Sequence, residues 1–161
     1  MSWSLRFTPD GQALIGRIGH MPETMGQQAG RAMTLSLALL EREVARRTPV
    51  STGLLRGSIF SAQQGQPVRW HRGVVGTPNK YAPYVEAGRR PGRMPPVAVL
   101  ARWAQLKLGD SRLGYVVARA IARRGTKGAH MFKNAARDNL ARVQGFWTDV
   151  LGITIKLTVR R

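Results

Sequence analysis

Carboxylates and histidines are the side chains of this chain that could carry acid–base or metal chemistry. Of the eight carboxylates only Glu41 and Glu43 are near neighbours in sequence, and two residues apart on a helix they point in different directions. The three histidines occupy separate segments, without the spacing of a metal site: His20, His71 and His130. The acid–base repertoire is therefore present only as scattered groups. We predict no enzymatic activity, no bound metal and no cofactor.

Glycine-rich segments are the next candidates for chemistry, because such loops can bind phosphates. The segment from Gly109 to Gly114 has the glycine spacing of a phosphate-binding loop, but Tyr115 follows where that loop requires a lysine. Gly73 and Gly76 flank two valines, which is more typical of a tight strand end. The chain contains no cysteine, which excludes disulfides and thiolate metal sites.

Charge is the feature that points to a partner. The 161 residues include 26 Lys and Arg against 8 Asp and Glu, which gives a net charge of +18. Such a field attracts nucleic acid, an acidic membrane surface or a strongly acidic protein. Arginine dominates the excess, and its planar guanidinium suits phosphates and carboxylates. Because the chain shows neither a signal peptide nor an apolar run of membrane-spanning length, we expect a soluble protein made in a cytoplasm.

Two groups of arginines are the candidate contacts for such a partner. The first group lies in a Gly/Pro loop over residues 88–96, and the second falls on one face of a helix that follows it. Each group also has a simpler explanation, as a solvated loop or as the solvent-facing side of an amphipathic helix. In order, the candidates are Arg89, Arg90, Arg93, Arg112, Arg119 and Arg123.

The elements that must position these arginines follow from periodicity and turn signals. Residues 4–8 alternate polar and apolar and predict a short strand. A long helix is expected from Pro22 to about Arg47, ending at Thr48-Pro49, because the residue before a proline avoids the helical region. Residues 50–80 are expected to be extended, with β runs at 58–61, 68–71 and 73–76 and a turn at 63–65. The apolar side of the long helix is predicted to be Met33, Leu37, Leu40 and Val44.

Three shorter helices are expected after the Gly/Pro loop. The first covers about 96–108 and stops at Gly109, the second runs from an N-cap at Ser111 to Arg124, and the third spans about 129–151. Their apolar sides are predicted to be Val99, Trp103 and Leu106, then Leu113, Val117, Ala120 and Ile121, and then Phe132, Ala136, Leu140, Val143, Trp147 and Val150. Strict alternation from Ile153 to Val159 predicts a final strand with one buried face.

Together these elements predict the α+β class and a single domain over residues 1–161. We expect a small mixed or antiparallel sheet packed against one long N-terminal helix and about three shorter helices. The strand-like segments at the two ends, residues 4–8 and 152–160, have no obvious partner inside so short a domain. They are therefore expected to pair with another chain. Trp70, Trp103 and Trp147 lie on strand or apolar helical positions, which favours core packing over nucleotide stacking.

Three short stretches, in their order and spacing, resemble a known family. They are residues 45–59, residues 75–77 with 81–88, and residues 120–128 leading to Met131, Phe132 and Ala135. The combination resembles the head–tail connector proteins of long-tailed bacteriophages, also called neck, minor tail or tail-completion proteins, over roughly residues 30–140. The chain departs from many relatives at Arg89 and Arg90, and residues 97–126 are longer than in the shortest members. The motif positions expected to be structural are Pro49, Gly53, Leu54, Tyr81, Tyr84, Glu86, Gly88, Gly125 and Phe132.

The resemblance implies a small α+β subunit, related in fold to tail-terminator proteins, that forms a homo-oligomeric ring around the DNA channel. It implies assembly in the bacterial host cytoplasm and a place in the virion at the head–tail junction, with no catalytic role, no cofactor and no membrane. The implied partners are other copies in a six-fold ring, neighbouring head-completion, tail-terminator or tail-tube proteins, and genomic double-stranded DNA in non-specific contact. The candidate arginines would then face the DNA channel or an acidic neighbouring ring.

Alternatives remain open for the function and for the second motif. A stand-alone basic nucleic-acid-binding protein would explain the charge alone, and a small nuclease would need the scattered His and acidic residues to converge on a metal. Tyr81, Tyr84 and Glu86 are either surface groups that bind a neighbour, or two tyrosines that cover the core beside a Glu86–arginine ion pair.

Overall fold

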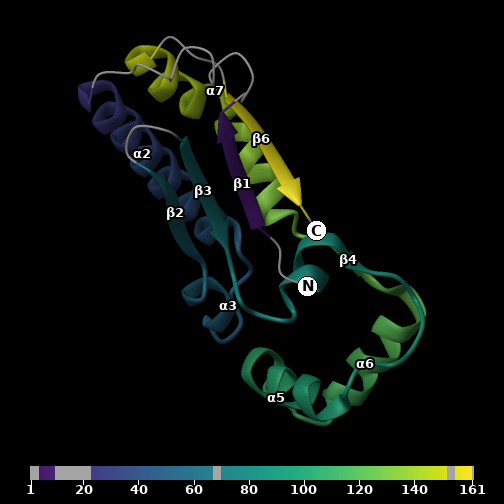
Figure 1. Ribbon diagram of the computed structural model, residues 1–161. Coiled ribbons are helices and arrows are strands. Elements are labelled where there is room, and N and C mark those ends of the chain that lie inside the picture. Colours follow the sequence, from purple (N-terminus) through teal and green to yellow (C-terminus); the bar gives the residue numbers. More distant parts are fainter. Residues whose placement is uncertain (1–3, 10–22, 67–69, 152–154, 161) are drawn as a thin grey trace.

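A mixture of helices and antiparallel strands builds the computed structural model, which describes residues 4–9, 23–66, 70–151 and 155–160 (Figure 1). The α+β class is therefore as predicted. In chain order the elements are β1 (Ser4–Pro9), α2 (Glu23–Arg47), α3 (Leu54–Gly57), β2 (Phe60–Gln66), β3 (Trp70–Gly76), α4 (Ala82–Ala87), β4 (Gly88–Arg89), α5 (Val97–Leu108), α6 (Leu113–Arg124), β5 (Thr126–Lys127), α7 (Met131–Leu151) and β6 (Ile155–Arg160).

The two terminal strands lie side by side in one four-stranded sheet. Its strand order is β2-β3-β1-β6, and all three neighbouring pairs are antiparallel. Leu5 of β1 is in register with Val75 of β3 on one side and with Val159 of β6 on the other. The expectation that the terminal strands lack a partner within the chain is therefore wrong, because β1 and β6 pair with each other.

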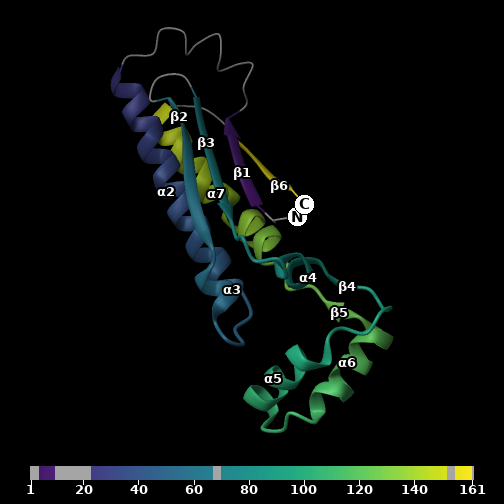
Figure 2. The same ribbon diagram turned by 60° about the horizontal axis from the view of Figure 1, so that its bottom comes forward.

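Helices α2 and α7 pack against each other and against one face of this sheet (Figures 1 and 2). The predicted apolar side of the long helix is buried, and so is most of the predicted stripe of the last helix. Trp147 is 1% exposed, and its indole Nε1 donates to the Oγ of Ser36 at 3.1 Å, so the polar atom of this large core side chain is satisfied. The large core side chains of the two helices include Met33, Leu37, Leu40, Val44, Phe132, Val143 and Trp147.

Several predicted boundaries in the middle of the chain are wrong. The expected turn at 63–65 lies inside β2, because β2 pairs with β3 continuously from Phe60↔Gly76 to Gln66↔Trp70. Residues 70–76 form one strand, β3, where two runs were expected. The short helix α3 interrupts what was predicted to be extended chain, and α4 follows that segment at a place where no element was predicted. Pairing with β3 overrides the turn preference of Gln63-Gln64-Gly65. This effect is non-local, so the local sequence pattern could not predict it. Val150 and the inward face of the last strand lie outside the described side chains.

Residues 88–128 form an arm that leaves the body of the protein, by which we mean the rest of the described chain. The two-stranded ribbon of β4 and β5 carries the hairpin of α5 and α6 away from the sheet (Figure 2). The apolar core cluster lies entirely in the body. The hairpin buries only small residues among its own, and these are Ala104, Gly114 and Ala118.

The predicted buried faces of α5 and α6 are therefore wrong. Val99, Leu106 and Leu113 are 68%, 58% and 37% exposed. At Gly114 a Cβ would lie 2.5 Å from the Cα of Ala101, so the two helices pack backbone against backbone through their small residues. Their larger apolar side chains are left outside. The ends of α5 match the prediction, with Gly109 as its C-cap at φ +79°, whereas the N-cap of α6 is Arg112, one residue after the predicted Ser111.

None of the described helices combines the length and the apolar character that a membrane span requires.

An ion-pair network joins the end of α2 to α7. Arg47 contacts Glu43 at 3.3 Å and Asp138 at 2.7 Å. The hydrogen bond from Arg137, followed by that from Arg47, holds the pKa of Asp138 below its ordinary value. The hydrogen bond from Arg46 does the same for the pKa of Glu43, against the opposing effect of burial.

The network predicts a pH-dependent contribution to stability. A carboxyl whose pKa is lowered by folding stabilises the protein above its unfolded-state pKa of about 4, and this stabilisation is lost as the pH falls through the folded-state value. Asp138→Asn should therefore lower the melting temperature at pH 7, and this difference should shrink as the pH falls below about 4 and Asp138 takes up a proton. Thermal unfolding between pH 7 and pH 2 measures this, with the exposed Asp149→Asn as control. A difference that persists unchanged at pH 2 would contradict the assignment.

Candidate functional site

The two chain segments that lead into and out of the arm are held together by contacts between the second and third sequence motifs. Glu86 is 1% exposed, and its two carboxylate oxygens accept hydrogen bonds from the backbone N–H groups of Phe132 and Lys133, both at 3.0 Å. These N–H groups belong to the first turn of α7, where no carbonyl of the same helix can reach them. A carboxylate at this position also interacts favourably with the helix dipole. Glu86 is therefore a cap for α7 that is supplied by a segment 46 residues earlier in the chain.

This position corrects both expectations for Glu86, whereas the exposure of Tyr81 and Tyr84 agrees with the alternative that they are surface groups. Glu86 is neither a surface group nor the partner of an arginine in an ion pair. Tyr81 and Tyr84 are 43% and 61% exposed, so they do not cover the core. The two tyrosines are thus surface groups beside a buried structural carboxylate.

Backbone contacts continue from the cap into the ribbon. The N–H groups of Ala129 and His130 donate to the carbonyls of Val85 and Glu86 at 2.7 and 3.0 Å. The ribbon then pairs Gly88 with Lys127 and Arg89 with Thr126. We call these contacts, between residues 85–89 and 125–133, the joint.

Two glycines of the motifs are required by the joint. Gly88 has φ +77°, and a Cβ there would lie 2.3 Å from the carbonyl oxygen of Thr126. Gly125 has φ +72°, and a Cβ there would lie 2.1 Å from the carbonyl oxygen of Arg89. Any side chain at either position would be strained in conformation and would also collide with the opposite backbone. The motif positions Gly88 and Gly125 are thus explained by the close approach of two chain segments.

The first motif lies beside the joint. Arg47 is the last residue of α2, and Pro49 follows it as predicted, while Gly53 takes φ +81° at the N-cap of α3. A pocket of about 360 Å³ separates this turn from the arm. Its walls are residues 49–53 with Leu55, Tyr81 and Val85 of the body, and Trp103 and Lys107 of α5. Parts of all three motifs therefore gather where the arm meets the body. Leu54, another motif position, is 68% exposed.

Positive charge is concentrated on the arm. Residues 88–128 contain ten Lys and Arg and a single acidic residue, Asp110, which is a net charge of +9, half of the +18 of the chain. Nine of the ten cations are exposed, and Arg89 is half-buried. Arg102, Lys107, Arg124 and Lys127 were not among the predicted contacts, although a count of charges by segment would have found them.

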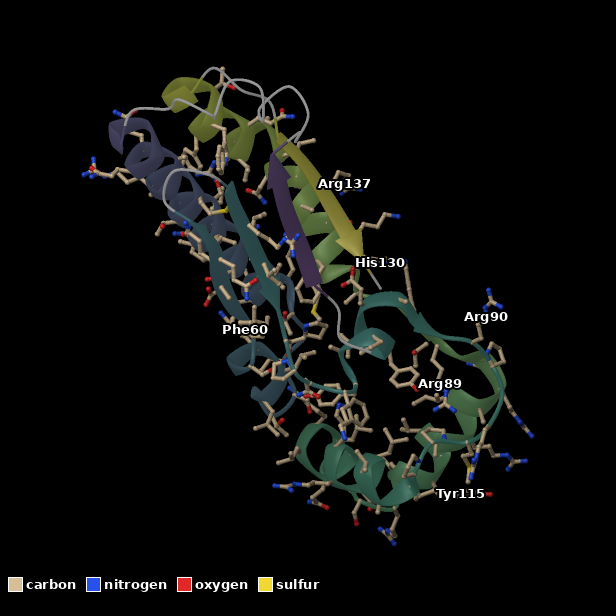
Figure 3. The ribbon with its side chains drawn as sticks, in the orientation of Figure 1. Phe60, Arg89, Arg90, Tyr115, His130 and Arg137 are labelled. Carbon is tan, nitrogen blue, oxygen red and sulfur yellow. The ribbon has the colours of Figure 1, made fainter. Side chains whose placement is uncertain are left out.

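The loop arginines divide into two kinds. Arg89 donates from its guanidinium to the carbonyl oxygen of Arg93, so it holds the loop in shape. Figure 3 shows Arg89 pointing into the arm and Arg90 pointing away from it. Arg90 and Arg93 are exposed. Of the three predicted loop contacts, two are therefore free to meet a partner, and one also has a structural role.

The helical arginines share one exposed face, as predicted. Arg112, Arg119 and Arg123 are all exposed, on the side of α6 away from the buried Gly114 and Ala118. Arg112 contacts Asp110 at 3.2 Å, and this contact lowers the pKa of Asp110. The exposed Tyr115 and Val116 lie among these arginines, and Tyr115 points away from the ribbon in Figure 3. We call this face, with Arg90 and Arg93, the basic face of the arm.

Within the described part of the chain, no group of three or more His, Asp or Glu side chains could hold a metal ion.

Comparison with known proteins leaves the function to be argued from this geometry. No family model, curated protein or solved structure matches the chain.

The buried cap gives a testable expectation for the joint. Glu86→Ala should lower the free energy of unfolding by about 1–3 kcal/mol, because two N–H groups of α7 lose their acceptor. For a domain of this size each kcal/mol corresponds to roughly 2–4 °C in melting temperature. Glu86→Gln, which keeps the shape but offers one acceptor oxygen, should have an intermediate effect. Thermal unfolding checks this, with Glu41→Ala on α2 as the matched control. A Glu86→Ala protein as stable as the Glu41→Ala control would contradict the capping role.

Proposed function

We propose that this protein is a structural subunit of the neck of a long-tailed bacteriophage. In this proposal its copies form a six-fold ring at the head–tail junction of the virion, with a fold related to tail terminators, and join neighbouring head-completion, tail-terminator or tail-tube proteins around the DNA channel. Its role is geometric and not catalytic.

The single observation that carries the proposal is the division between a body that holds the apolar core and an arm that is densely basic. The motif residues that resemble the neck family include the ones that fix this division, namely Glu86, Gly88, Gly125 and Phe132. An assembly subunit must hold its contact surfaces in fixed positions relative to its neighbours. Motif residues that fix the position of an exposed, charged arm suit that role.

The chemistry of the basic face suits the DNA backbone. Exposed arginines make charge-assisted contacts with phosphates, and such contacts do not read the base sequence. A channel through which a genome slides needs attraction of this kind without sequence recognition. The exposed arginines of the arm supply it.

The test replaces Arg90, Arg93, Arg119 and Arg123 by Gln and leaves Arg89 in place to keep the loop in shape. Duplex binding should weaken equally across sequences. The slope of log affinity against log salt should become shallower by roughly 0.9 for each phosphate that the variant no longer neutralises. The matched control replaces four exposed arginines of the body, Arg31, Arg42, Arg56 and Arg142, which makes the same change in net charge.

The comparison of the two variants separates the alternatives. Weaker binding in the arm variant alone supports the proposal, and equal weakening in both would mean that total charge decides, as for a stand-alone basic nucleic-acid-binding protein. If the basic face instead docks an acidic neighbouring ring, the arm variant should bind DNA normally while tails fail to join heads.

A further inference from the structure

The outer side of α5 carries an apolar stripe that nothing in the described chain covers. Val99, Trp103 and Leu106 are spaced by four and three residues and so share one side of the helix. The opposite side, with the buried Ala104, packs against α6. Val99 and Leu106 are 68% and 58% exposed, and Trp103 is half-buried. The periodicity that predicted a core face is real, but this face has no partner within the described chain.

The stripe continues into the pocket between the arm and the body. Trp103 belongs to both, because it lines the pocket together with Val50, Leu55, Tyr81 and Val85. Val50 and Tyr81 are themselves 49% and 43% exposed. The stripe and the pocket together form one apolar surface, which we call the arm–body groove. It lies on the opposite side of the hairpin from the arginines of α6, because each helix packs on the other through the side that faces away from its exposed residues.

The rim of the groove is positively charged. Arg102 lies on the exposed side of α5 and Lys107 in the wall of the pocket, and both are exposed. No carboxylate occurs on α5, and the nearest one in sequence, Asp110, is paired with Arg112. An occupant of the groove must therefore combine apolar side chains with negative charge.

The described side chains of a second copy do not offer that combination. Most of the carboxylates on the described side chains are already committed: Glu43 and Asp138 to arginines, Asp110 to Arg112 and Glu86 to the start of α7. Glu41 and Asp149 lie on α2 and α7, two helices that each contain more Lys and Arg than Asp and Glu. Charge complementarity thus favours a different protein over a second copy.

We infer that the arm–body groove binds an acidic amphipathic segment of another protein. Its apolar side chains pack on Val99, Trp103 and Leu106, and its carboxylates meet Arg102 and Lys107. This site is separate from the basic face and does not depend on DNA contact, so one arm can meet the genome on one side and a protein neighbour on the other.

The probe for this site is a fluorescent helical peptide with Leu on one side and Glu on the other. Two companion peptides replace either every Glu by Lys or every Leu by Ser. Fluorescence anisotropy at physiological salt should show that the Leu/Glu peptide binds at least about tenfold more tightly than either companion. Equal binding of the Leu-to-Ser peptide would reduce the effect to bare charge attraction and overturn the inference, as would no binding of the Leu/Glu peptide.

Paired substitutions test whether the peptide binds on the stripe. Val99→Ser/Leu106→Ser leaves the charge unchanged and should lower the peptide affinity about tenfold. The matched control, Leu108→Ser/Val116→Ser, removes one Leu and one Val that are 51% and 59% exposed elsewhere on the hairpin, and it should bind within about twofold of the unchanged protein. Arg102→Gln/Lys107→Gln should lower the affinity for the Leu/Glu peptide. The same variant should not lower the affinity for the companion peptide in which Lys replaces every Glu.

Two further measurements show whether nucleic acid or a second copy of this chain, instead of another protein, occupies the arm–body groove. If the stripe variant binds duplex DNA more weakly than the unchanged protein, the stripe contacts nucleic acid and not a protein. If it changes the mass of the assembled species in light scattering, a second copy fills the groove. Either result would overturn the inference, whereas unchanged DNA affinity and unchanged mass alongside the roughly tenfold loss of peptide affinity support it.

Discussion

The structure depends on one buried carboxylate. Glu86 lies at 1% exposure against the first turn of α7, and burial of a charge is tolerated only where hydrogen bonds replace its hydration. The N–H groups of Phe132 and Lys133 provide them at 3.0 Å. α7 forms much of the apolar core, and the ribbon of the arm begins at Gly88, two residues after Glu86. This contact therefore ties the start of the arm to the core.

The body packs through large apolar side chains, whereas the arm packs through small residues. In the body, the pairing of β1 with β6 brings both ends of the chain into the sheet, and α2 and α7 supply large apolar side chains to one core. The arm has only two helices, which meet through Ala101, Ala104, Gly114 and Ala118. Such a thin contact leaves no room for large side chains between the helices. Its Val, Leu and Tyr residues, and its charges, are consequently displayed on the outside, where partners can reach them.

Sequence reasoning located α2 and α7 and much of their core, because a helix on a sheet shows a clear periodicity in Met33, Leu37, Leu40 and Val44. The same reasoning misassigned Val99 and Leu106, since periodicity reveals an apolar face without telling whether the same chain covers it. Glu86 could not be identified as a cap from local patterns, because its partners are 46 and 47 residues away. The pairing of the terminal strands was missed for the same reason. The arginine face of α6 was predicted correctly, since spacing along one helix is sufficient to define it.

The proposal that these surfaces serve a ring is tested most directly by the mass of the assembled protein. Native mass spectrometry or light scattering over a range of concentrations, combined with micrographs of purified phage particles, gives the number of subunits and their place. The proposal predicts a closed species of six copies, found at the head–tail junction. A chain that stays monomeric at the highest concentration and is absent from purified particles would contradict it.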